Sequence, residues 1–362
     1  MWDGRFNLGN GMDSSRKAIF LTGGAGVLGK ALLEKLSDVE VICLAHQKPI
    51  AGSNVRTVQG DICRPYLGLS PSKFEDLARR TDYVVHSAAM TNFSRPEKVL
   101  FDINVEGTKR VLELAASAGA PVCHISTAFA YSDRHVSDHY RTHAYERSKL
   151  EAERIVRDSG LASVIVRPSI VIGDSSDGSM SAFQGFHFLM DLFVRGTLPV
   201  PAASKAVVDF VPRDLVAAVV MALTKRPDVT GEYWITAGEQ ALPLERVMTL
   251  WVEHLRRLTG RVVKQPRFVD ADIVERLFRP ALLPALPPET QMLMGPAIEL
   301  VKYFNITRPF PSSLDHLAAV VGSPPLPNSE LTLIRNVEFR VRHSASSQAP
   351  VPGSYRTGDQ RT

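Results

Sequence analysis

Cysteine is scarce in this chain of 362 residues, which contains only Cys43, Cys63 and Cys123. Because their number is odd and they form no CxxC pair, the sequence argues against a disulfide framework and against a zinc site, and is typical of a reducing compartment. Long apolar runs are also missing. The run LVAAVVMAL at 215–223 is too short to cross a bilayer, so no membrane span is predicted.

A strong excess of one charge is absent as well. The chain has 42 Lys and Arg against 38 Asp and Glu, which gives a net charge of +4, and no basic block dominates. The sequence therefore lacks the footprint of a nucleic-acid-binding protein. Its first residues, MWDGRFNLGNGMDSSRK, have no apolar core like that of a signal peptide. We expect a cytoplasmic protein without a nucleic-acid partner.

What the chain does contain is a regular alternation of apolar runs and helix-like stretches. The apolar runs are nearly continuous, as in strands that are buried on both faces. Alternating β and α segments predict an α/β fold, with a Rossmann-type, doubly wound parallel sheet. The predicted strands are AIFLT (18–22), EVICLA (40–45), VRTVQ (55–59), YVVHSA (83–88), PVCHIS (121–126) and SVIVRP (163–168).

The alternation weakens after about residue 174, where prolines become frequent. Helices expected near 243–259 and 270–279 belong to a smaller, mainly helical C-terminal substrate lobe. Both ends of the chain are polar and rich in Gly, Ser or Pro, which is typical of disorder. The predicted organisation is a disordered segment at 1–16, a Rossmann core at 17–173, a smaller lobe at 174–342 that returns to the core near 205–237, and a disordered tail at 343–362.

The glycine-rich stretch TGGAGVLG, residues 22–29, follows the first predicted strand and opens a helix. Gly23, Gly26 and Gly29 give the spacing G-x-x-G-x-x-G. Glycines let the backbone approach a pyrophosphate closely, and a helix N-terminus supplies free N–H groups for it. This context favours a dinucleotide-binding loop. The alternative is a strand-to-helix turn that binds no ligand.

The end of the second strand, ICLAHQKP, bears on the choice of dinucleotide. NAD-binding proteins usually carry Asp or Glu there, whereas this chain has His46 and Lys48. Basic groups attract a 2′-phosphate that a carboxylate would repel, which favours NADP(H). The alternative is that both are ordinary solvated loop residues. Asp61, in QGDIC after the third strand, either reaches the adenine edge or is a simple turn residue.

The stretch AYERSKLEAE places Tyr145 and Lys149 four residues apart, on one face of a predicted helix. A phenol titrates near ~10, and a neighbouring cation is expected to lower that pKa. Lys149 can also hold the nicotinamide ribose. Tyr145 would then be a general acid toward a carbonyl oxygen that receives hydride. Thr127, in HISTAFAY at the end of the fifth strand, can donate to the same oxygen, and Ser126 supports the turn.

Six motifs occur in an order that resembles the extended short-chain dehydrogenase/reductases: TGGAGVLG, HSAAMTNF, NVEGT, STAFAY, YERSK and VRPSIVIGD. The resemblance covers roughly residues 17–240. It implies that Thr127, Tyr145 and Lys149 form the catalytic triad. It also implies that Asn104 supports the site. With the residues named above, the predicted cofactor-binding set is Thr22, Gly23, Gly26, Val27, Leu28, Gly29, His46, Lys48, Asp61, Ile62, Ala88, Ala89, Asn104, Tyr145, Lys149, Pro168 and Ser169.

Within that family, HSAAMTNF, STAFAY and YERSKLEAE look most like thioester reductases and fatty acyl-CoA reductases. VRPSIVIGDSSDGSMSAFQG followed by VDFVPRDLV adds to the resemblance. It implies NADPH-dependent reduction of an acyl thioester to an aldehyde or an alcohol. Many members carry Arg where this chain has His46. We recognise no adenylation or carrier domain in the sequence, so a thioester substrate would arrive on CoA or on a separate carrier protein.

Three other functions stay open, because one fold serves many reactions. One is oxidoreduction of a ketone or alcohol, as in hydroxysteroid or dihydroflavonol enzymes. Another is the epimerase or dehydratase reaction on a nucleotide sugar, against which the missing acid after the second strand argues. The third is a nucleotide-sensing scaffold without activity, which the intact Tyr145 and Lys149 disfavour.

Two further stretches carry weaker signals. His135, His139 and His143 stand at helical spacing with Asp138 among them, which is a possible metal-ligand pattern. The segment lacks apolar periodicity, so we expect a loop, with no metal, that either lines the substrate cleft or is solvated. The aromatic stretch FQGFHFLMDLFVRGTLPVP at 183–201 would line an acyl pocket or form core, and its helical spacing favours core.

Overall fold

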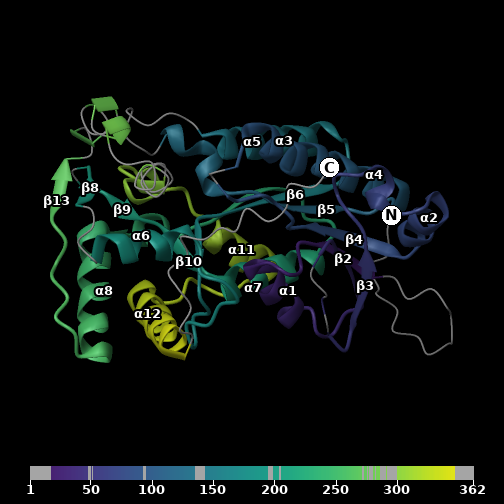
Figure 1. The fold of residues 1–362 in the computed structure, drawn as a ribbon. Helices are drawn as coiled ribbons and strands as arrows, with labels where there is room; N and C mark the ends of the chain where they lie inside the picture. Colours follow the sequence, from purple (N-terminus) through teal and green to yellow (C-terminus); the bar gives the residue numbers. More distant parts are fainter. Residues whose placement is uncertain are drawn as a thin grey trace.

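The structure is a computed structural model that describes residues 18–346 apart from 48–49, 51, 93–94, 135–142, 195–198, 204 and most of 271–299. It confirms the Rossmann-type α/β fold: a seven-stranded parallel sheet with the order β11-β6-β5-β4-β1-β2-β3 (Figure 1). The strands are β1 (Ala18–Thr22), β2 (Val41–Ala45), β3 (Val55–Gln59), β4 (Thr81–His86), β5 (Val122–Ile125), β6 (Ser163–Pro168) and β11 (Gly231–Ile235).

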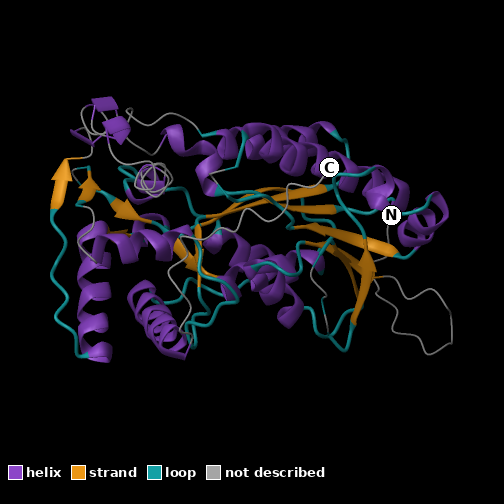
Figure 2. Cartoon of the chain, in the orientation of Figure 1, coloured by secondary structure: helices purple, strands orange, loops and turns teal. Residues whose placement is uncertain are grey.

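Helices cover both faces of this sheet, which explains its continuous apolar runs (Figure 2). In β1, Phe20 packs toward one helical layer and Leu21 toward the other. The edge strand β3 departs from the expectation of full burial, because its residues are exposed or half-buried. One layer holds α2 (Pro71–Arg79), α3 (Glu97–Phe101), α4 (Gly107–Ala118) and α5 (Ala144–Asp158), and the other holds α1 (Val27–Lys35), α7 (Arg213–Thr224) and α11 (Leu314–Val321).

The strand order reverses between β1 and β4, which are neighbours in the sheet although β2 and β3 lie between them in sequence. A crevice forms at such a switch point, outside the carboxyl ends of the strands. Thr22 ends β1 and His86 ends β4, in paired register. The glycine-rich stretch and the HSAAMT stretch therefore leave the sheet side by side.

A third apolar cluster lies beyond the far end of the sheet, between α6 (Gly185–Val194), α8 (Leu244–Thr259) and α12 (Ser329–Ser346) (Figure 1). Helix α6, within the aromatic stretch expected at 183–201, contributes to it as core, whereas Phe183 is exposed. The ring of Phe186 stacks on Phe304 at 5.6 Å and meets Trp251 edge-on at 5.6 Å. Short strand pairs also lie in this part of the described chain: β7 (Ile170–Ile172) with β10 (Phe210–Pro212), β9 (Val207–Val208) with β12 (Leu242–Pro243), and β8 (Val200–Ala202) with β13 (Phe268–Asp270).

Some predicted boundaries in this half of the chain change. The helix expected at 243–259 is α8, whereas residue 270 ends strand β13 and most of 271–279 lies outside the described residues. The tail expected from 343 is wrong at its start, because α12 continues to Ser346. The segments 1–16 and 347–362 lie outside the described residues, and the division into core and lobe stays a prediction. No helix within the described part of the chain has the length and apolar character of a membrane span.

Candidate active site

The glycine-rich loop is closed tightly against the end of β4. Gly23 has φ +79°, and a Cβ there would lie 2.6 Å from the backbone nitrogen of Ala88. That nitrogen donates to Thr22 Oγ1 at 3.2 Å, and Thr22 Oγ1 lies 2.7 Å from His86 Nδ1. A Cβ on Gly29 would lie 2.1 Å from the Gly23 carbonyl oxygen. Glycine is therefore required at both positions by close packing of the backbone.

Helix α1 begins directly after Gly26, and no side chain among the described residues caps it. Its first turn carries no acidic residue, and a Cβ on Gly26 would approach only the Gly23 carbonyl, at 3.3 Å. Val27 is buried and Leu28 packs beside the core, so this turn offers backbone N–H groups to a ligand. Uncapped N–H groups beside an open glycine fit the pyrophosphate of a dinucleotide.

At the end of β2, His46 and Asp61 come together. His46 Nε2 and Arg64 Nε lie 3.8 Å and 3.6 Å from the same oxygen, Oδ2 of Asp61. Asp61 Oδ1 also accepts a hydrogen bond from the Cys63 nitrogen at 2.9 Å, so the carboxylate also caps a turn. We had not predicted Arg64, although its place three residues after Asp61 was a readable signal. Lys48 lies outside the described residues.

The stretch after β4 is held by Asn104, which is almost fully buried. Its Oδ1 accepts from the Met90 nitrogen at 2.7 Å, and its Nδ2 donates to the Met90 carbonyl at 3.1 Å and to Ser148 Oγ at 2.9 Å. These bonds tie the segment containing Ala88 and Ala89 to helix α5. The side chain of Asn104 therefore supports the site from behind.

The ends of two further elements contribute predicted cofactor residues. Ile62 packs against the start of α4, because a Cβ on Gly107 would lie 2.8 Å from Ile62 Cδ1. Pro168 ends β6 and pairs in register with Ile235 of β11. The Ser169 nitrogen donates to the Ile235 carbonyl at 3.1 Å. The turn at 168–169 is thereby fixed at the carboxyl edge of the sheet.

The three predicted catalytic residues lie at this same edge, and all are buried. Thr127 follows the end of β5 and shares a side-chain hydrogen bond with Tyr145 in the first turn of α5. Burial is the largest influence on Tyr145 and raises the pKa of its phenol, while the hydrogen bond with Thr127 lowers it. The nearby charge of Glu146 raises that pKa further. The expected lowering of this pKa by Lys149 is therefore not found.

Lys149 is instead directed toward the sheet. Its Nζ donates to the Ile125 carbonyl at 2.7 Å and lies 3.4 Å from His124 Nε2. Burial lowers the pKa of the Lys149 ammonium to about 8, and the charge of Glu153 opposes that effect. The His86 ring beside this group has its pKa lowered by burial to about 3, so it is neutral at pH 7.

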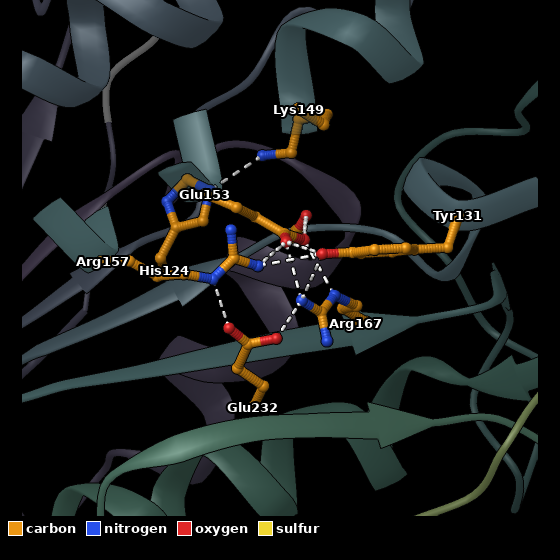
Figure 3. A network of polar contacts seen from close by, with 8 residues as sticks. His124, Tyr131, Lys149, Glu153, Arg157, Arg167 and Glu232 are labelled. Atoms are coloured by element: carbon orange, nitrogen blue, oxygen red, sulfur yellow. Dashed lines mark hydrogen bonds and ion pairs between the residues drawn. The ribbon is translucent and has the colours of Figure 1, made fainter. Parts of the chain in front are cut away.

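A buried polar network that the sequence analysis missed lies below Lys149 (Figure 3). At its centre Arg167 Nη2 of β6 and Glu153 Oε2 of α5 form an ion pair at 2.7 Å, and both side chains are at most 2% exposed. Glu153 stands one turn after Lys149 on the same helix, so the repeated spacing of four residues was a signal. Its partner was not readable, because Arg167 lies on a different element.

Helix α5 begins at a histidine. His143 is its N-cap: its Nδ1 accepts from the Tyr145 nitrogen at 3.1 Å, and its own nitrogen donates to Glu146 Oε2 at 2.8 Å. His135, Asp138 and His139 lie outside the described residues. The residues that the structure does describe contain no group of three His, Cys, Asp or Glu side chains that could hold a metal ion.

Comparisons with known proteins agree with this geometry. Residues 43–220 match the family model of an NAD-binding domain described as male sterility protein. L-2-aminoadipate reductase of Saccharomyces cerevisiae is 30% identical over 268 residues, 65% of this chain and 19% of that protein. Fatty acyl-CoA reductase wat of Drosophila melanogaster is 30% identical over 156 residues, 34% of this chain and 30% of that protein.

A solved structure shows the same fold. The terminal R domain of the myxalamid PKS-NRPS biosynthetic pathway superposes with a TM-score of 0.72 at 22% identity, covering 93% of both chains. In eight of the curated relatives that it matches, this chain spans only 4% to 50% of their length. The matches and the nucleotide-binding geometry together indicate a nicotinamide cofactor. In sequence and fold the chain is therefore similar to the extended short-chain dehydrogenase/reductases, in the branch that contains the thioester reductases and the fatty acyl-CoA reductases.

Proposed function

We propose that this chain is an NADPH-dependent reductase that converts an acyl thioester, carried by CoA or by a separate carrier protein, to an aldehyde or alcohol. The observation that carries the proposal is the hydrogen-bonded pair of Thr127 and Tyr145 at the carboxyl edge of β5, with Lys149 one helical turn further. Two hydroxyl donors meet there beside a cation, at the end of the sheet where this family binds its cofactor.

In the proposed mechanism, Gly23, Gly26 and the first turn of α1 hold the pyrophosphate, and bound NADPH supplies the hydride. Tyr145 and Thr127 donate hydrogen bonds to the thioester carbonyl oxygen and stabilise the charge that develops on it. Because burial raises the pKa of Tyr145, the phenol keeps its proton until that oxygen becomes basic enough to accept it. The hemithioacetal then loses its hydroxyl proton while the C–S bond breaks, which gives an aldehyde and a free thiol.

Lys149 is assigned to the ribose of the nicotinamide half. A pKa of about 8 leaves this group mostly protonated at pH 7. Its positive charge is lost as the pH rises through that value. Activity is therefore expected to fall on the alkaline side of about pH 8 in a profile of kcat/KM against pH.

The preference for NADPH is supported by the groups around the end of β2. His46 and Arg64 approach one oxygen of Asp61 from two directions, and no carboxylate follows β2 directly. These two side chains are the candidates to hold a 2′-phosphate, with Asp61 toward the adenine. An Arg64→Ala variant is expected to weaken NADPH binding several-fold and to leave NADH binding unchanged.

The thioester assignment rests on the family branch. R domains of multidomain synthetases and fatty acyl-CoA reductases are the named relatives, and this chain matches only a part of most of them. A carrier protein or CoA would then present the acyl group to Thr127 and Tyr145. A ketone or aldehyde reductase would use the same residues, so the substrate decides between the two activities.

Cofactor consumption by the purified protein tests the proposal. NADPH and NADH are offered separately, against medium- and long-chain acyl-CoA thioesters, the matching aldehydes and a set of ketones. Oxidation of NADPH with a thioester, together with release of free CoA, is the expected result. Turnover of ketones alone would contradict the thioester assignment and would make the chain an ordinary carbonyl reductase.

A further inference from the structure

Helix α5 carries a stripe of four polar residues at successive intervals of four: Tyr145, Lys149, Glu153 and Arg157. The first two are the predicted catalytic pair. The third member of the stripe, Glu153, is fully buried although its side chain is a carboxylate. Figure 3 shows the polar contacts that surround it. Positions four apart lie on one helix face, so Glu153 lies directly below Lys149.

The Glu153 carboxylate receives donors from four segments, one of which is the Tyr131 hydroxyl, which donates to Oε2 at 3.3 Å. Its Oε1 accepts from Ser126 Oγ at 2.5 Å and from Arg167 Nε at 2.9 Å. Its Oε2 accepts from Arg167 Nη2 at 2.7 Å and from Arg157 Nη2 at 2.7 Å. One side chain thereby joins the end of β5, the end of β6 and the body of α5.

Each of these contacts lies next to a predicted site residue. Ser126 directly precedes Thr127, which shares its hydrogen bond with Tyr145. Arg167 directly precedes Pro168, at the turn that carries the predicted cofactor-binding residues Pro168 and Ser169. On β5 and β6, the residue that contacts the Glu153 carboxylate is therefore the immediate neighbour of a predicted site residue. On helix α5, Glu153 itself lies one turn after Lys149. A shift of Glu153 would move all three components relative to one another.

Arg167 is itself held from the other side. Its guanidinium lies over the ring of Tyr131 at 4.6 Å and over Trp234 at 5.2 Å, and it is ion-paired with Glu232 of β11. A buried ion pair is expensive to desolvate and is stable only when its remaining donors and acceptors are satisfied, as they are here. Apolar residues would fill the same space without that penalty. A contribution to stability therefore does not by itself explain why charged residues occupy this buried position.

The charged and titratable groups around Lys149 also indicate a role for Glu153 other than stability. His86 faces it from β4, His124 from β5 and Arg167 lies beyond on β6, while Glu153 and Tyr145 share its helix. Burial lowers the pKa of both histidines, so both rings are neutral at pH 7, and the Nδ1 atom of His124 finds no hydrogen-bond partner among the described residues. Glu153 is the group that favours the charged form of Lys149 against burial.

We propose that Glu153 is a positioning residue that holds Thr127 and Tyr145 in register and keeps the Lys149 ammonium charged while the nicotinamide ribose is bound. This inference rests on the proposed nicotinamide-dependent reductase but not on the thioester substrate. Glu153 contacts neither cofactor nor substrate. It acts through Ser126 on one side, through Arg167 on the other and through its charge on Lys149.

The test is the dissociation constant of NADPH as a function of pH, measured by the fluorescence of the bound cofactor and requiring no substrate. In the wild-type chain, affinity is expected to fall as the pH rises through about 8, because Lys149 then loses its proton. Glu153→Gln keeps the shape of the side chain but removes its charge. It should move that fall about one unit toward lower pH. The kcat at pH 7 should drop about 100-fold, because the reacting groups are no longer aligned.

Two other variants keep the test decisive if Glu153→Gln folds poorly. Arg157→Gln removes a half-exposed cation from Glu153, so more of the negative charge acts on Lys149, and the fall in affinity should move toward higher pH. Glu151→Gln is the matched control on the same helix. Its carboxylate pairs with Arg154 at the surface, so its profile should overlay that of the wild type.

The outcomes separate this inference from the proposed function. If Glu153→Gln and Arg157→Gln both give the wild-type pH profile, or shift it in the same direction, the inference is wrong even though turnover continues. A wild-type profile that is flat between pH 6 and 10 would also overturn it. If the wild type binds NADPH with the expected profile but reduces no thioester, the proposed substrate fails and the role of Glu153 stands.

Discussion

Helix α5 contains two fully buried glutamates, and they are stabilised in opposite ways. Glu146, in the first turn, accepts from the Tyr303 hydroxyl at 2.8 Å and from the His143 backbone at 2.8 Å, which are neutral donors. Glu153, two turns later, is paired with the cations of Arg157 and Arg167. The first contact joins the helix to the C-terminal apolar cluster, and the second joins it to the central sheet.

The difference shows what each carboxylate does to its catalytic neighbour. The charge of Glu146 raises the pKa of Tyr145 and so favours the neutral phenol, a proton donor. The charge of Glu153 raises the pKa of Lys149 and so favours the ammonium, a cation. Each glutamate thus keeps the adjacent group in its protonated form. The partners differ in the part of the molecule to which they attach the helix: the Tyr303 hydroxyl belongs to the C-terminal cluster, and the Arg167 guanidinium belongs to the sheet.

Breaking the contact between Glu153 and Arg167, which joins helix α5 to the sheet, should have the largest effect on stability. Glu153→Ala leaves the Arg167 guanidinium buried without its main partner, because both groups are almost inaccessible to water. We expect a loss of about 3–5 kcal/mol in the free energy of unfolding. Chemical denaturation followed by circular dichroism measures it. A loss below about 1 kcal/mol would mean that water or Glu232 replaces Glu153 as a partner.

Breaking the contact to the C-terminal cluster should have a smaller effect. Tyr303→Phe removes one hydroxyl donor from a buried carboxylate and keeps the ring that packs edge-on against Phe129 at 4.4 Å. We expect a loss of about 1.5–3 kcal/mol, as for hydrogen bonds to charged groups. NADPH affinity should not change, because this contact joins α5 to the C-terminal apolar cluster and not to the glycine-rich loop. Hydrogen exchange should rise in the first turn of α5, and equal exchange in both proteins would contradict the link.

The smallest effect is expected at the surface of the same helix. Glu151→Ala removes a carboxylate that is 35% exposed and paired with Arg154, which also contacts Asp158. Exposed pairs contribute about 0–1 kcal/mol, so unfolding should be nearly unchanged. This variant measures the background against which the two buried glutamates are compared. A loss as large as that of Tyr303→Phe would show that burial of the carboxylate does not set the order of the series.

The features that could be predicted from the sequence are local ones. Gly23, Gly26 and Gly29 lie between a strand and a helix, and Tyr145 and Lys149 share one helical turn, so short spacings were enough. The Glu146–Tyr303 bond joins residues 157 positions apart, and no periodicity reports such a contact. The pKa of Tyr145 also could not be inferred, because it depends on burial and on the direction in which Lys149 points.

The C-terminal half was less readable for the same reason. Phe186, Phe304 and Trp251 come from three separate segments and meet only in the folded cluster. Strand β11 joins the sheet beside β6 after more than sixty residues of intervening chain, as their register of Gly231 with Val164 shows. Composition predicted a second lobe there. It did not predict which elements return to the sheet.

The most direct measurement counts free thiol against oxidised NADPH when the purified chain is given a medium-chain acyl-CoA, for the wild type and for Tyr145→Phe. We predict one thiol for each NADPH if reduction stops at the aldehyde, and one thiol for two NADPH if it continues to the alcohol. Tyr145→Phe should lose about 100- to 10,000-fold in rate while binding NADPH as tightly as the wild type. NADPH oxidation without thiol release, or a Tyr145→Phe variant that retains most of its rate, would contradict the proposed reaction.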